Sequence, residues 1–348
     1  MDRTERKPSS EGRGISANAV IVVLAVMLAL CIVLSFALGR YPVRVSELFG
    51  ILLSRLPFVS IEKFWTDTQE IAVWNVRLPR ILLAVLVGAC LSAAGCAYQG
   101  VFQNPIAAPD ILGASAGAGF GAALAIFLSL GSTGITALAF LMSLVTVALV
   151  FLIGRRTRGE RTLGLVLAGI VISSLFQAGT SFIKLVADPN NKLPAITYWL
   201  MGSLVGATRD ELRFVIWPML LGLVPMYLLR WRINVITMGD SEARSMGVDA
   251  DKVRIAVIIC ATLLTAASVS VSGMIGWVGL VIPHMMRRLV GSDHRKLLPA
   301  SVLGGGLFLL IVDDLSRNLL SAEIPIGILT AVIGAPFFLV LITRRVAE

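Results

Sequence analysis

Long uninterrupted apolar runs are the feature that most constrains this 348-residue chain. Several reach about 18 residues or more, the length that an α-helix needs to cross the hydrocarbon core of a bilayer. In lipid, every backbone N–H and C=O must be satisfied inside a helix or in a closed barrel, and the roughly ten-residue alternating strands of a barrel are absent from the sequence. Because 57% of the residues are hydrophobic and 15% charged, the composition agrees with this reading. The sequence predicts an all-α, polytopic membrane protein.

The apolar runs divide the chain into about ten membrane-spanning helices. Residues 1–16 are polar and rich in Ser, Arg and Glu, so we expect a short disordered cytoplasmic tail followed by one transmembrane domain over 17–348. Residues 41–78 and 187–212 are long connections in which we expect short interfacial helices. The expected spans are 18–39, 80–100, 112–130, 135–154, 162–186, 214–230, 253–273, 277–291, 298–319 and 325–343.

The positions of the basic residues set the expected orientation. An even number of spans puts both ends of the chain on one side. With both ends inside, 19 of the 30 Lys and Arg residues lie in cytoplasmic segments, as the positive-inside rule requires. We therefore expect both termini in the cytoplasm. The net charge of +9 arises in short loops and not on one folded face, which argues against nucleic-acid binding.

Several chemistries are excluded or disfavoured by what the sequence lacks. No Lys is followed by Ser or Thr, so the phosphate loop of an ATPase cannot be present and any ATP hydrolysis must come from partner subunits. The four cysteines lie in apolar runs without metal-ligand spacing, and we expect no metal site. Gly113–Gly117 matches G-x-S-x-G but lacks the strand–turn–helix context of a hydrolase. Few charges fall near the middle of a span, which disfavours an ion-driven carrier.

Polar and small residues recur at helical spacing in three spans. Ser173, Gln177 and Ser181 are four residues apart, and such a stripe either bonds neighbouring helices or lines a water-filled path. Asp313 and Arg317 can pair on one helix face, a role in local neutralisation that stands beside a functional one. Small residues at Ala84, Gly88, Ser92, Cys96 and Gly100 predict close helix packing.

A cytoplasmic stretch between two spans, within a loop of about 233–252, predicts one more short helix. We expect Asp240 or Ser241 to cap it and Gly247 to terminate it. Such a helix could be a knob for a partner's groove or an ordinary interfacial loop. Its residues are Gly239, Asp240, Ser241, Glu242, Ala243, Arg244, Ser245, Met246 and Gly247.

From about residue 70 to its end, the chain resembles the membrane permeases of ABC importers for iron-siderophores, haem and cobalamin. Several long motifs occur in the order found in that family. They are Arg77–Arg80 (RLPR), Gln99–Ala107 (QGVFQNPIA), Asp110–Gly113 (DILG), the Gly239–Gly247 loop, Gly276–His284 (GWVGLVIPH) and Glu323–Gly327 (EIPIG).

The resemblance implies a ten-helix subunit that dimerises about a two-fold axis, with the transport path at the interface. It also implies a second permease subunit, identical or related, two ATP-binding-cassette ATPases inside and a solute-binding protein outside. Arg77, Arg80 and Arg317 match arginines that receive acidic residues of the docked binding protein. Gly239–Gly247 matches the helices seated on the ATPase, and Thr162 matches a gate position.

These observations lead us to expect a transport subunit, not an enzyme, in the bacterial cytoplasmic (inner) membrane. It would carry no cofactor of its own, since ATP and Mg would bind to the partner ATPases. The expected cargo is a ferric siderophore, with haem or cobalamin as alternatives within the family. An ATP-independent secondary transporter is the alternative from another class.

Overall fold

The described part of the chain is helical in this computed structural model, which describes residues 16–39, 41–55, 62–154, 156 and 161–346 and contains no strand among them. The expected tail falls almost entirely on residues 1–15, outside the described residues. The elements are α1 (Ala17–Ala37), α2 (Val45–Leu53), α3 (Asp67–Ile71), η1 (Ala72–Arg77), α4 (Leu78–Val101), η2 (Pro109–Leu112), α5 (Ala114–Phe127), α6 (Ser132–Gly154), α7 (Arg161–Val186), α8 (Lys192–Leu200), α9 (Arg209–Ile236), α10 (Asp240–Ser245), α11 (Ala250–Ser272), α12 (Val278–Val290), α13 (His294–Asn318) and α14 (Ile326–Val346).

Each of the ten expected spans coincides with one of these helices. Seven described helices are long and apolar enough to cross a membrane, whereas α5 and α12 have 14 and 13 residues and reach only about 20 Å. The polytopic all-α prediction is confirmed, and the expected short helices in the first long connection are α2 and α3. The orientation of the termini stays a prediction.

The start of α9 differs from the expected boundary because a capping box extends the helix. α9 begins at Arg209, not near 214, because Thr208 caps it: the Thr208 Oγ1 accepts from the Glu211 N–H, and the Glu211 carboxylate accepts from the Thr208 N–H. This capping box places Asp210 and Glu211 in the first turn, where carboxylates favour the helix dipole. Sequence analysis treated the same charges as part of a loop.

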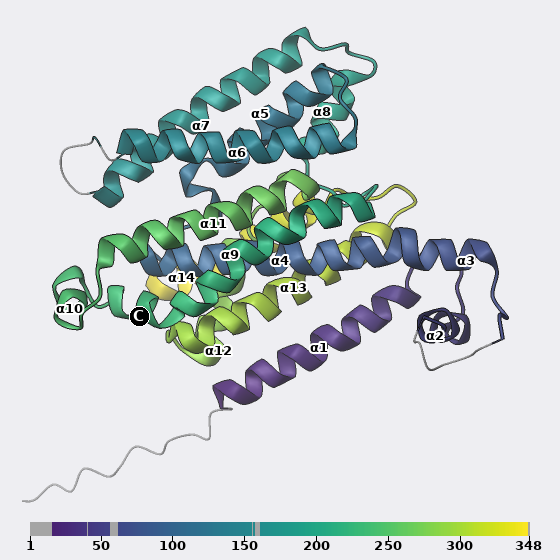
Figure 1. The fold of residues 1–348 in the computed structure, drawn as a ribbon, viewed down its shortest axis with the longest axis horizontal. Helices are drawn as coiled ribbons and strands as arrows, with labels where there is room; N and C mark the ends of the chain where they lie inside the picture. The colour runs from purple at the N-terminus through teal and green to yellow at the C-terminus, as the bar shows by residue number, and fades with distance from the viewer. Residues whose placement is uncertain (1–15, 40, 56–61, 155, 157–160, 347–348) are drawn as a thin grey trace, which may run out of the picture.

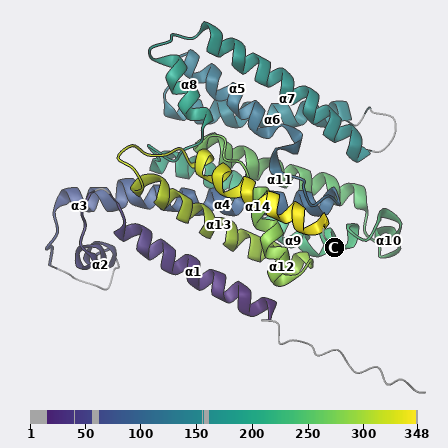
Figure 2. The same ribbon diagram turned by 180° about the vertical axis from the view of Figure 1, so that it is seen from behind.

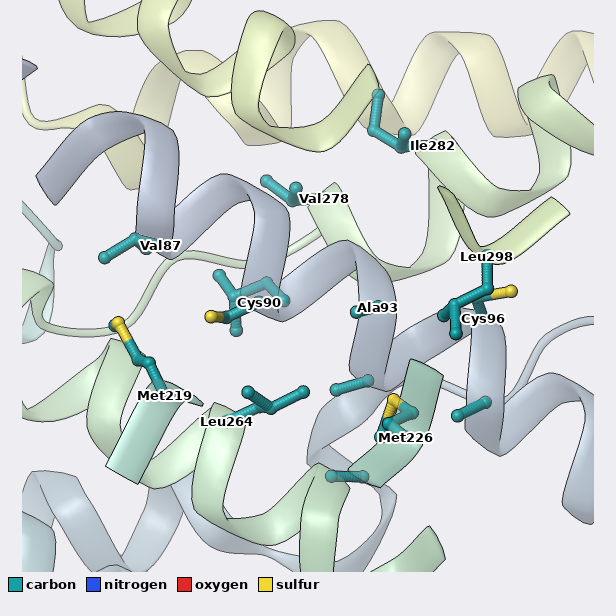
Figure 3. Close-up of a cluster of buried hydrophobic side chains, with 14 of the residues drawn as sticks. Val87, Cys90, Ala93, Cys96, Met219, Met226, Leu264, Val278, Ile282 and Leu298 are labelled. Carbon is teal, nitrogen blue, oxygen red and sulfur yellow. The ribbon is translucent and has the colours of Figure 1, made fainter. Parts of the chain in front are cut away.

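Helix α4 is the centre of the fold. Its side chains are buried along nearly its whole length, and Figure 3 shows them between neighbours from four other helices. On one side lie Met219 and Met226 of α9 and Leu264 of α11; on the other lie Val278 and Ile282 of α12 and Leu298 of α13. A helix enclosed on all sides is apolar all round, so its sequence shows no amphipathic pattern.

Small residues let α4 approach its neighbours closely, as the sequence predicts. A Cβ added to Gly88 would lie 2.2 Å from the carbonyl oxygen of Gly305 on α13, and one added to Gly95 would lie 1.8 Å from that of Gly279 on α12. Neither position can hold a larger side chain unless backbone moves. Close backbone contact of this kind provides the dispersion energy that holds helices together in lipid.

The helices form two groups, and the molecule is elongated, so that it has two distinct ends. Helices α5, α6, α7 and α8 form a layer beside the larger group around α4 (Figures 1 and 2). In both views α10 lies at one end of the molecule, whereas α2 and α3 lie at the opposite end. A partner that binds α10 and a partner that binds near α3 would therefore contact opposite ends of the protein.

Candidate functional sites

The three arginines expected to dock a binding protein meet at the α3 end of the molecule. Arg77, Arg80 and Arg317 all line one cavity of about 400 Å³. We call it the arginine cavity, and its lining residues are Gly39, Tyr41, Thr68, Ile71, Ala72, Val76, Arg77, Arg80, Arg317 and Glu323. All three arginines are more than nine-tenths buried, which sequence analysis did not anticipate for contact residues.

Arg80 is held by two carboxylates. Its Nε and NH2 donate to Asp313 at 3.0 and 2.8 Å, and Asp313 is fully buried. Its NH1 and NH2 also donate to the two oxygens of Glu323, at 3.2 and 2.9 Å. A bidentate arginine–carboxylate pair is among the stronger hydrogen-bonded contacts in proteins. Arg80 therefore joins α4 to α13 and to the connection between α13 and α14.

Arg317 lies closest to Asp314, and the expected partner Asp313 is farther away. Its NH2 donates to the Asp314 carboxylate and, at 2.5 Å, to the Ser35 Oγ of α1. The expected partner, Asp313, lies 3.9 Å from the Arg317 Nε and is engaged mainly with Arg80. The expected pair of Asp313 and Arg317 is present as a longer ion pair, but Asp314 is the closer partner, because the rotation of α13 points Asp313 at α4 and Asp314 at α1.

Arg77 differs from the other two arginines because carbonyl oxygens bind it. Its NH1 donates to the Phe36 carbonyl and its NH2 to the Tyr41 carbonyl at 2.5 Å, so it holds the connection between α1 and α2. Among the described residues it has no ion pair with a carboxylate. Its charge is therefore solvated by dipoles and is not neutralised by a counter-ion.

The expected short helix at the other end of the molecule is present as α10. It begins at Asp240 after Gly239, and no side chain caps it, so the prediction that Asp240 or Ser241 would be the cap is wrong. Its end is as predicted: Gly247 has φ +76°, and the Val248 N–H donates to the Ala243 carbonyl. This left-handed conformation is nearly free of strain only for glycine.

Helix α10 projects from the body as a small knob. Only Ala243 is buried within it. The neighbouring Met238 and Met246 are exposed, and an Arg254 NH2 from α11 donates to Asp240 at 3.1 Å to hold the knob in place. Exposed methionines around a short, anchored helix provide an adaptable apolar contact surface.

A polar joint connects the α9 end, next to the knob, to α13. The Asn234 Nδ2 donates to Asp293 at 2.5 Å, and the Asn234 Oδ1 accepts from the His294 N–H at 2.7 Å. Asp293 caps α13, and hydrogen bonding from Arg295 lowers its pKa from 3.8 to about 2. These bonds tie the end of α9 to the start of α13.

The predicted polar stripe on α7 is partly exposed. Gln177 and Ser181 are exposed, whereas Ser173 lies against the turn that begins α5, with its Oγ 2.3 Å from a Cβ built on Gly113. Ser174, which sequence analysis missed, lies on the exposed face with Gln177 and Ser181; the spacing of three and four residues could have identified it. Thr162 lies in the first turn of α7, and its side chain is outside the described part of the chain.

Two residues that bind Arg80 and Arg317, Ser35 and Glu323, could not be assigned a role from the sequence. Ser35 occurs in an apolar run, and Glu323 occurs in a family motif without an assigned role. Each forms a hydrogen bond with a residue more than 240 positions away in the sequence, Ser35 with Asp314 and Glu323 with Arg80. Such contacts become visible only when the helices are packed.

Comparison with known proteins identifies the family. The model of the FecCD transport family matches residues 27–344. The chain belongs to the FecCD transport family. It is therefore an ABC transporter permease, a transport subunit whose ATPase is a separate chain, and a multi-pass protein of the inner membrane.

Individual FecCD relatives agree over nearly the whole chain. The molybdate import system permease protein MolB of Haemophilus influenzae is 40% identical over 321 residues, covering 92% of this chain and 94% of that one. A probable iron chelatin transport system permease of Helicobacter pylori is 40% identical over 278 residues, covering 80% and 84%. A solved structure of a metal-chelate type ABC transporter in an inward-facing conformation matches with a TM-score of 0.83 and 38% identity, over 94% and 99%.

Proposed function

We propose that this permease imports a ferric siderophore by alternating access, together with a second permease subunit, two ATPases and an extracytoplasmic binding protein. In this mechanism ATP binding closes the ATPases, α10 transmits the movement, and the helices open one side of the path at a time. The FecCD membership supports the ATP-driven class over an ion-driven carrier.

The observation that carries the proposal is a set of uncharged polar residues on the exposed face of α7, between the exposed apolar side chains of Val171, Leu175 and Phe182. Gln177 and Ser181 are exposed in the middle and outer part of a membrane helix, where contact with lipid would leave their polar groups poorly solvated. Contact with water in the path or with the second permease subunit would solvate these groups. A path without fixed charge suits a large chelate, because it offers hydrogen bonds without trapping a ligand that must leave.

Docking of the binding protein is proposed at the arginine cavity. Arg77 lines the cavity and has no carboxylate partner in the described part of the chain, so it can attract an acidic side chain from outside. Arg77 is the leading contact, since Arg80 and Arg317 are already paired with carboxylates of this chain. Charge complementarity of this kind would orient the partner and raise its association rate.

The cargo is tested by uptake in vesicles that contain the assembled transporter. Iron-55 in a siderophore should accumulate only with ATP inside and the binding protein outside, and excess molybdate should not compete. Haem and cobalamin are included as competitors because both remain alternatives within the family. Accumulation of radioactive molybdate in place of iron would support the second candidate, which the similarity to the Haemophilus permease favours.

A further inference from the structure

The arginine cavity contains a carboxylate that nothing in the proposed docking role requires. Among the charged lining residues that the structure describes, Glu323 is the single acid beside Arg77, Arg80 and Arg317. Asp313 and Asp314, which also bind arginines there, do not line the cavity. The cavity proposed to bind an acidic side chain of the partner therefore has one negatively charged residue, Glu323, in its lining.

Arg80 does not need Glu323 for neutralisation. Asp313 accepts from both its Nε and its NH2 and is fully buried, so this pair alone is neutral. Glu323 binds the remaining outward N–H groups and is less buried than Asp313, with 22% of its side chain exposed against none. The Glu323 carboxylate thus occupies the donors that an incoming acid would reach first.

The location of Glu323 allows its side chain to leave while the backbone stays. It lies in the connection from Asn318 to Ile326, outside any helix. The adjacent Ile324 is fixed to α13 by two hydrogen bonds with Ser316, one through each backbone group of Ile324. Rotation of the Glu323 side chain alone therefore frees the N–H groups of Arg80 that Asp313 does not bind.

We propose that Glu323 is a built-in competitor that sets the affinity of the arginine cavity for an acidic side chain of the binding protein. The inference rests on the proposed docking role of that cavity. In the undocked permease, the Glu323 carboxylate accepts hydrogen bonds from Arg80. On docking, a partner carboxylate takes its place there and also meets Arg77, three residues earlier on the same helix face. The competitor keeps docking reversible, so that the binding protein can leave after delivery.

The test measures the affinity of the cognate binding protein for the assembled transporter in lipid nanodiscs. Glu323→Gln removes the competing charge and keeps the shape, and we expect it to tighten binding roughly tenfold, the effect of one hydrogen bond to a charged group. Glu323→Asp keeps the charge and shortens its reach, and should tighten binding by a smaller factor.

Asp210→Asn is the matched control. It removes an exposed negative charge at the same end of the molecule, beside Arg209, which donates to the Trp74 carbonyl. It should change affinity less than about twofold.

The outcomes separate the inference from the docking role. Arg77→Ala should weaken binding; if it does and Glu323→Gln leaves the affinity unchanged or lowers it, docking stands and the competitor role is refuted. An Arg77→Ala variant with unchanged affinity refutes the docking role itself, and with it the inference. Should Glu323→Gln fail to assemble, the Glu323→Asp variant decides by the same criterion.

Discussion

At the scale of single residues, the charged groups of this protein divide into those that hold helices together and those that remain available. Arg80 and Arg317 are bound by carboxylates from the same chain, and removing one partner of such a buried pair would cost several kcal/mol because the other charge stays buried. Arg77 keeps its charge without a counter-ion among the described residues. The same residue type is therefore neutralised inside the chain at two positions and keeps an unpaired charge at the third, which is the leading proposed docking contact.

Asp293 gives a pH-dependent prediction at this scale. Hydrogen bonding from Arg295 lowers its pKa from 3.8 to about 2, so its stabilising effect is present above about pH 4 and is lost as the pH falls through 2. Asp293→Ala should lower the stability by about 1 kcal/mol at pH 7 through loss of the α13 cap. The unfolding midpoint of the detergent-solubilised protein, followed by circular dichroism, measures this.

The Asn variant separates charge from capping at the same position. Asp293→Asn keeps an acceptor for the Arg295 N–H and should lose less stability than wild type between about pH 4 and pH 2, because it has no charge to lose. A wild-type midpoint that is no more sensitive to pH than that of the Asn variant in this window would exclude the depressed pKa.

Residue partners were the least predictable part of the site. Sequence spacing indicated Asp313 as the partner of Arg317, because only neighbours along one helix can be identified from spacing. Arg317 binds Asp314 of its own helix, but the carboxylates that bind Arg80 and the Ser35 carbonyl that binds Arg317 lie 233 to 282 residues away. These contacts depend on how α1, α4 and α13 pack, and no local pattern encodes that.

At the scale of elements, the helices were predictable because lipid demands apolar runs with internally satisfied backbones. Their ends were less so: a capping box extends α9 to Arg209, and α10 follows Gly239, which has no side chain to cap it. The end of α10 was predictable, since Gly247 supplies the left-handed conformation. Backbone conformation thus fixes the knob as much as its side chains do.

Gly247→Val tests whether the shape of the knob matters for coupling. At φ +76° a β-branched residue costs roughly 1–2 kcal/mol, although a Cβ there would meet no atom within 4 Å. We expect stimulation of the ATPase by the binding protein to fall roughly fivefold or more. Gly131→Val is the matched control, since its Cβ also meets open space and its φ is ordinary. Equal stimulation in both variants would contradict the proposed role of α10.

At the scale of the whole molecule, the two candidate contact sites lie at opposite ends, with α10 at one and the arginine cavity at the other (Figures 1 and 2). The number of spans and the distribution of Lys and Arg predicted that the two sites lie on opposite sides of the membrane. They did not predict that α4 is the enclosed helix or that α5–α8 form a separate layer, because those features arise from packing among helices of similar composition.

Orientation gives a prediction at this scale. In a Cys31→Ser background, Met246→Cys should react with a membrane-impermeant thiol reagent only in inside-out vesicles, and Phe64→Cys only in right-side-out vesicles. Both native side chains are exposed, and the other three cysteines are buried. The reverse labelling pattern would contradict the expected cytoplasmic position of α10.

ATP-dependent uptake tests the central claim most directly, that this chain forms the path of a binding-protein-dependent, ATP-driven importer. The assembled transporter is reconstituted in liposomes with ATP inside, and the loaded binding protein is added outside. The account predicts accumulation of the labelled ferric siderophore that requires both components and survives collapse of the proton and sodium gradients. Accumulation that continues without ATP but stops when those gradients are collapsed would contradict it.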